Sequence, residues 1–154
     1  MRRLSGVLLA GAVLILPAFS QTAFAQAAPA APQKTTYTGE LVLAAYTVNP
    51  GKEADYEKVL ATLKDSLMKS QRPEAKQQLA GWKVIKNSAA QPDGSSLWVH
   101  VITPVKDADY SITNLVYEVV KDPMEQKTFY DLYRGALQKA LFVIQGPVSA
   151  DFSK

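Results

Sequence analysis

The sequence predicts an α+β fold, with a four-stranded antiparallel sheet and helices on one face of that sheet. Short runs rich in leucine, β-branched and aromatic residues predict strands. Segments whose apolar residues recur every three or four positions predict amphipathic helices. Pro, Gly and Asn cluster between these segments, as they do at turns. The order is β-α-β-β-α-β with the second α element divided in two, and a hairpin flanked by two β-α crossovers is the ferredoxin-like arrangement.

The first half of the predicted domain contains a strand, a long helix and a short helical turn. Residues 40–48 (ELVLAAYTV) form the strand, which the Asn-Pro-Gly triplet at 49–51 ends. The long helix begins at Glu53 and ends before Arg72, and residues 74–80 add the helical turn. Apolar residues lie on one face of the long helix: Tyr56, Val59, Leu60, Leu63 and Leu67.

The second half contains a hairpin, two helices and a last strand. Residues 82–87 and 96–103 form the hairpin across a turn-rich connection. Asp109 caps a helix, and Asp122, followed by Pro and later Glu, is a fuller helix-start signal. Residues 142–145 form the last strand. Apolar residues step through the two helices as follows: Ile112, Leu115, Val116 and Val119 in the first, and Phe129, Tyr133, Leu137 and Leu141 in the second.

The strand at 96–103 is apolar on both faces. Alternation puts Leu97, Val99 and Val101 on one side, and Trp98, His100 and Ile102 on the other. Since helices are predicted on only one face of the sheet, the second face needs another cover. An identical sheet from a second chain supplies it, so a homodimer packed sheet against sheet is predicted.

The N-terminus has the three parts of a secretory signal. A basic start precedes the apolar stretch 6–16, and the small-x-small pattern at 23–25 predicts cleavage between Ala25 and Gln26, with cleavage after Ala27 as an alternative. Residues 26–37 are rich in Ala and Pro and are predicted to be a flexible spacer, so the folded domain spans 38–154. The mature protein is expected in the periplasm or outside the cell, without stable membrane insertion.

Composition excludes several kinds of chemistry. The 154 residues include no Cys and one His, which removes disulfides, thiol nucleophiles, thiolate zinc sites and His-rich metal sites, so no metal is predicted. Without residues 1–25 the chain keeps 15 basic and 14 acidic residues and no Lys/Arg run longer than two, which argues against nucleic-acid binding. The glycine-rich nucleotide motifs, HExxH and GxSxG are missing from the sequence.

Residues 46–56 (YTVNPGKEADY) resemble the strand–PGKE–helix opening of dimeric α+β barrel proteins, the superfamily that includes antibiotic-biosynthesis monooxygenases (ABM-like proteins). Residues 81–84 (GWKV) and 105–117 are similar to small secreted members of unknown function. The resemblance covers about residues 38–152 and is more specific for fold than for function. Characterised members are cofactorless oxygenases, haem-degrading enzymes and small-molecule-binding proteins, and these are the activities that the resemblance implies.

The haem-degrading branch works with an Asn, a Trp and a His, and this chain contains Asn49, Trp98 and His100. In that branch the His lies on a helix and ligates iron. Here His100 lies on a predicted strand and Asn49 in a turn, so those roles are not transferred and no cofactor is predicted.

Five residues are candidates for a functional site. His100 is the first candidate for proton transfer, because an imidazole titrates near neutrality, and Tyr117 is the second. The alternative for His100 is a hydrogen-bonded interior residue with no catalytic role. Trp82 and Trp98 join these two as candidate ligand-binding residues, since their rings can stack on a planar ligand, with core or dimer packing as the alternative. Tyr46 is a further candidate, because its hydroxyl can orient a phenolic or quinone-like substrate.

Two functions follow from these candidates. The first is a secreted homodimer that binds a small apolar or aromatic molecule or serves a non-catalytic envelope role. The second is a cofactorless monooxygenase that acts on an aromatic substrate and uses His100 with a Tyr or Trp to steer a proton. The sequence leaves open whether the pocket lies between sheet and helices or between two sheets.

Overall fold

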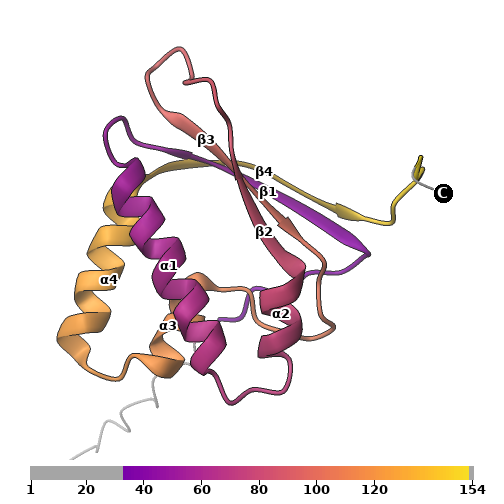
Figure 1. The fold of residues 1–154 in the computed structure, drawn as a ribbon, viewed down its shortest axis with the longest axis horizontal. Coiled ribbons are helices and arrows are strands. Elements are labelled where there is room, and N and C mark those ends of the chain that lie inside the picture. The colour runs from indigo at the N-terminus through magenta and orange to yellow at the C-terminus, as the bar shows by residue number, and fades with distance from the viewer. Residues whose placement is uncertain (1–32, 153–154) are drawn as a thin grey trace, which may run out of the picture. The chain divides into compact units, whose positions relative to one another are not determined.

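A computed structural model describes residues 33–152. The predicted signal peptide and the spacer up to residue 32 lie outside this range. Four strands and four helices follow one another in the order βααββααβ, as an α+β fold (Figure 1). In chain order they are β1 (Leu41–Val48), α1 (Glu53–Lys69), α2 (Ala75–Gly81), β2 (Trp82–Lys86), β3 (Ser96–Ile102), α3 (Ile112–Val119), α4 (Pro123–Ala136) and β4 (Leu137–Gly146).

From β1 to β3 the chain folds as its pattern predicts. A turn after β1 places Gly51 at φ 73°, a left-handed conformation that glycine adopts without steric cost. On α1 four residues of the predicted apolar face are buried, and two of them, Tyr56 and Val59, are fully inaccessible to solvent. Leu60, on the same face, is partly exposed. The prediction of a long helix, a short second helix and a hairpin is confirmed.

Side-chain caps fix where the last two helices begin. The Ser111 side chain accepts a hydrogen bond from the backbone N–H of Asn114 at the start of α3. The Asp122 carboxylate accepts from the backbone N–H groups of Met124 and Glu125 at the start of α4. These bonds satisfy N–H groups that have no partner within the helix. The predicted cap at Asp109 is therefore displaced by two residues, to Ser111.

The end of α4 differs from the prediction. The four-residue spacing placed Leu137 and Leu141 on the helix, but α4 ends at Ala136 and both leucines belong to β4. β4 is thus ten residues long, instead of the four predicted at 142–145. Spacing by four is compatible with a strand as well as a helix, because residues four positions apart share a face in both structures. Pairing with β1 is the tertiary interaction that decides between them.

The strands form one antiparallel sheet in the order β2-β3-β1-β4. All four helices lie on the same side of the sheet (Figure 1). The registers align Trp82, Ala44 and His100 on the helix side, since Val84 pairs with His100 and His100 with Ala44.

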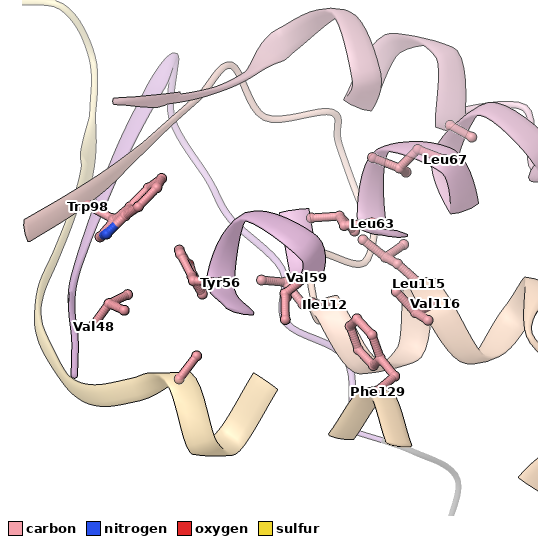
Figure 2. Close-up of a cluster of buried hydrophobic side chains, with 12 residues drawn as sticks. Val48, Tyr56, Val59, Leu63, Leu67, Trp98, Ile112, Leu115, Val116 and Phe129 are labelled. Carbon is pink, nitrogen blue, oxygen red and sulfur yellow. The ribbon is translucent and has the colours of Figure 1, made fainter. Parts of the chain in front are cut away.

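A buried cluster joins the sheet to the helices. Tyr56 reaches from α1 toward Trp98 on β3, with ring centroids 5.1 Å apart in an edge-to-face arrangement (Figure 2). The indole N–H of Trp98 donates to the Ser96 hydroxyl at 3.0 Å. In this arrangement the positive edge of one ring faces the negative face of the other, which is an attractive interaction. Trp98 is therefore a core residue whose polar atom is already bonded.

The opposite face of the sheet is apolar and lacks a helical cover. We call it the open sheet face. Ile85, Phe142 and Ile144 on this face are 57%, 47% and 59% exposed. Exposed apolar side chains on a sheet face are typical of surfaces that contact a partner. Its apolar residues follow from the strand registers: Leu41, Leu43, Ala45, Ile85, Leu97, Val99, Val101, Phe142 and Ile144. The same registers place Thr47 and Lys83 on this face.

Within residues 33–152, the helices are too short or too polar to cross a bilayer.

Candidate functional site

A cavity of about 140 Å³ lies between the sheet and the helices. We call it the tyrosine cavity. Strands β1, β2 and β3 form one side of its wall, and helices α3 and α4 form the other. Within a single chain, this pocket therefore lies between the sheet and the helices. The segment before β1 completes the wall. The residues that define its chemistry are Thr35, Tyr37, Tyr46, Trp82, His100, Tyr110, Ser111, Thr113 and Tyr133.

His100 is held from both of its ring nitrogens. The indole N–H of Trp82 donates to Nδ1 at 2.9 Å, and Nε2 lies 2.7 Å from the Tyr56 hydroxyl. An indole N–H can only donate, so Nδ1 must be the unprotonated nitrogen of a neutral ring. The proton is therefore on Nε2, which donates to the Tyr56 oxygen.

Burial keeps this imidazole neutral. Only 1% of His100 is exposed, and desolvation lowers its pKa from 6.5 to about 4. The groups packed around it are the rings of Tyr46, Tyr56 and Trp82, none of which is a carboxylate that could stabilise a positive charge. At neutral pH His100 is an uncharged wall residue with both nitrogens engaged, which makes it a weak base.

The tyrosine hydroxyls also remain uncharged. Burial raises the pKa of Tyr37 and of Tyr133 from 10.0 to about 12, with smaller contributions from neighbouring tyrosines. Desolvation also raises the pKa of Tyr46. Each hydroxyl therefore keeps its proton and can donate one hydrogen bond as well as accept. None of the lining side chains carries a formal charge at neutral pH.

Aromatic contacts fix the walls. The rings of Tyr46 and His100 meet edge to face with centroids 5.3 Å apart. Trp82 and Tyr110 are 5.5 Å apart, and Tyr37 and Tyr110 are 5.3 Å apart. Each ring is held by at least one other ring, so the cavity is preformed.

The segment before β1 is tied down over this cavity. The backbone N–H of Thr35 donates to the Asp109 carboxylate at 2.9 Å, and its carbonyl accepts from the N–H of Tyr110 at 2.7 Å. Asn114 donates its side-chain amide to the carbonyl of Gln33. Residues 33–37, which the sequence assigned to the spacer, thus contribute Thr35 and Tyr37 to the cavity wall.

The structure brings together three of the five predicted site residues. Tyr46, Trp82 and His100 all line the tyrosine cavity. Trp98 lies in the buried core instead. Tyr117 packs against Phe129 and donates its hydroxyl to the carbonyl of Gln126, away from the cavity.

Six further wall residues with hydroxyl groups were not among the five candidates: Thr35, Tyr37, Tyr110, Ser111, Thr113 and Tyr133. Tyr133 was assigned to packing because it lies on the apolar stripe of its helix. Tyr37 was assigned to the spacer. A tyrosine on an otherwise apolar stripe was the available signal, because its hydroxyl needs a polar partner or a cavity when it is buried.

Among the described residues, no group of three or more His, Asp or Glu side chains could hold a metal ion. Compared with known proteins, the chain matches no family model, no curated protein and no solved structure.

Proposed function

We propose that the protein binds a small uncharged aromatic molecule in the tyrosine cavity. The observation that carries this proposal is a preformed wall of aromatic rings and neutral hydroxyls without a charged group. A carboxylate or ammonium group would lose its hydration there without finding an opposite charge, at a large cost. A phenol or a quinone-like carbonyl compound would instead exchange hydrogen bonds with tyrosine hydroxyls.

The volume limits the ligand to one ring. The cavity measures about 140 Å³, and a cavity of about 150 Å³ in another protein accommodates benzene. Two fused rings would require the segment before β1 or helix α3 to move outward.

Isothermal titration calorimetry of the protein with three compounds tests this proposal: phenol, benzoate and cyclohexanol. Phenol should bind with 1:1 stoichiometry, cyclohexanol more weakly because it lacks a ring face, and benzoate not detectably. Thr113→Phe projects a ring into the cavity and should abolish phenol binding. Thr128→Phe is the matched control, because Thr128 lies on α4 but does not line the cavity. Equal binding of benzoate and phenol, or unchanged binding by Thr113→Phe, would contradict the proposal.

The alternative function, a cofactorless monooxygenase of the ABM-like class, needs a base that activates the substrate. His100 would have to give up its bond to Trp82 or Tyr56 to act in this way, and its pKa of about 4 makes it a poor proton acceptor. Binding without turnover is therefore the function that we favour. Oxygen consumption by the protein with bound phenol would reverse this preference.

We also propose that the chain is a homodimer joined through the open sheet face, as in the dimeric α+β barrel proteins that residues 46–56 resemble. The exposed Ile85, Phe142 and Ile144 support this proposal. Sedimentation equilibrium should give twice the chain mass for residues 33–154. Ile144→Lys should give a folded monomer, whereas Met68→Lys on exposed α1 surface should not change the mass. A wild-type monomer at micromolar concentration would contradict the dimer.

Export by the signal at 1–25 remains a further part of the proposal. Mass spectrometry of the protein purified from its host should show an N-terminus at Gln26 or two residues later. An intact Met1 would contradict export with cleavage.

A further inference from the structure

A second cavity, of about 320 Å³, lies where α1 and α2 pack on the edge strand β2. We call it the leucine groove. Six of its seven lining side chains are apolar, and the seventh is Lys64. Its volume is at the lower end of the range of about 300–1,000 Å³ typical of ligand pockets. The apolar lining consists of Leu60, Leu63, Leu67, Leu79, Trp82 and Val84.

The floor of the leucine groove is rigid. Leu63 and Leu67 at its base are only 5% and 3% exposed and belong to the buried cluster, where Figure 2 shows them on α1. Leu79 and Val84 pack against the same cluster from α2 and β2. The groove is therefore a recess in the fixed core, open to solvent on one side.

Lys64 is the single charge on this groove. The residue is exposed, and its ammonium group makes no ion pair with the described residues. Glu57, seven residues earlier on the same helix, is paired with Lys86 at 3.6 Å. Asp65 does not line the groove. The arrangement thus combines an apolar recess with an unpaired cation at its rim.

We propose that the leucine groove binds a single-chain anionic amphiphile, such as a fatty carboxylate, with its tail along the leucines and its carboxylate at Lys64. An apolar tail gains from leaving water, and a carboxylate at the rim stays solvated while it pairs with the ammonium group. The volume admits one acyl chain and not the two chains of a phospholipid. The site is distinct from the tyrosine cavity, whose lining includes no Asp, Glu, Lys or Arg, although Trp82 lines both.

Decanoate, octanoate and decyltrimethylammonium are the probes, titrated below their micelle concentrations into the full folded protein by calorimetry. Decanoate should bind with 1:1 stoichiometry. Octanoate should bind roughly fifteenfold more weakly, because it is two methylenes shorter and each buried methylene contributes about 0.8 kcal/mol. Decyltrimethylammonium has the same tail with the opposite charge and should bind more weakly than decanoate.

Two variants locate the site. Lys64→Glu should weaken decanoate binding by about fivefold, because it replaces an attractive ion pair at an exposed site with a repulsive one. Lys69→Glu makes the same charge change on the same helix outside the groove and should have no effect. Leu79→Trp fills the groove and should abolish binding, and Leu60→Trp is the second filling variant if the first lowers the thermal midpoint.

Equal affinity of wild type and Lys64→Glu, or of decanoate and decyltrimethylammonium, would overturn the proposal. So would decanoate binding that survives both filling variants, because the tail would then lie outside the leucine groove. Binding to anionic phospholipid vesicles without binding to decanoate would also overturn it. Phenol binding to Leu79→Trp, measured in parallel, tests the tyrosine cavity independently, because Leu79 lines the leucine groove and not that cavity.

Discussion

Replacement of His100 by glutamine should remove the acid sensitivity of this fold. His100 is buried neutral between Trp82 and Tyr56, and its pKa in the folded chain is about 4, against 6.5 when it is solvated. Below pH 6.5 the unfolded chain takes up a proton at this residue, whereas the folded chain does so only near pH 4. Stability is therefore complete above pH 6.5 and falls as the pH drops toward 4.

The size of the effect follows from the pKa difference. One pKa unit corresponds to 1.36 kcal/mol, so the shift from 6.5 to about 4 corresponds to a loss of about 3 kcal/mol. The carboxylates with lowered pKa values, Asp55 and Asp93, act at lower pH, because they lose stabilisation only below their ordinary value of 3.8. Since the chain has one histidine, the loss between about pH 6.5 and about pH 5 is specific to His100.

Urea unfolding followed by tryptophan fluorescence between about pH 7 and pH 4.5 measures the effect. The wild-type free energy of unfolding should fall at a limiting slope of about 1.4 kcal/mol per pH unit below pH 6. Gln in His100→Gln offers one acceptor and one donor to the same partners and does not titrate, so its curve should be nearly flat. The variant should lose about 1–2 kcal/mol at pH 7 through poorer hydrogen-bond geometry.

Parallel pH curves for the two proteins would refute the assignment of a neutral, desolvated His100. A flat wild-type curve would do the same. The imidazole signal of the single histidine in an NMR titration gives an independent value for its pKa in the folded state, and a value near 6.5 would contradict the burial argument.

Three further predictions concern the scaffold around the site. Asp122→Ala removes both cap bonds of α4 and should cost about 1 kcal/mol in urea unfolding, while an unchanged midpoint would show that the cap is dispensable. Gly81→Ala should destabilise the fold by about 1–3 kcal/mol, because the new Cβ would lie 2.8 Å from the backbone carbonyl oxygen of Thr103. Gly135→Ala should be neutral or stabilising, because a Cβ at this position would have no heavy atom within 4 Å. Equal thermal shifts of the two variants would contradict this contrast. Asp109→Ala should release the N–H of Thr35 and speed deuterium uptake over residues 33–38, and unchanged uptake would mean that other contacts hold this segment.

The sequence carries enough information for most of the fold. The stripe from Tyr56 to Leu67 permits only one buried face for α1, and the Asp-Pro pair at 122–123 supplies a cap and a first residue that need no tertiary partner. Alternation along β3 correctly puts Trp98 and His100 on the same side. These patterns depend on neighbours within about seven residues, which is why they can be read locally.

The geometry of the candidate site depends on contacts between residues far apart in the sequence, and local sequence patterns do not predict such contacts. The site candidate His100 was identifiable as the lone histidine, but its neutral state is a consequence of Trp82 and Tyr56, which lie 18 and 44 residues away. Tyr37 reached the cavity only because Asp109 and Tyr110 hold the segment before β1. The end of α4 was likewise decided by pairing with β1.

Side-chain periodicity, then, determined which residues turn inward from each helix and strand. Only the packed tertiary structure decided which inward residues meet, because water exclusion at His100 and at the tyrosines arises from elements far apart in the chain. Desolvation is a collective property of those neighbours, and it is the physical reason that the cavity is uncharged.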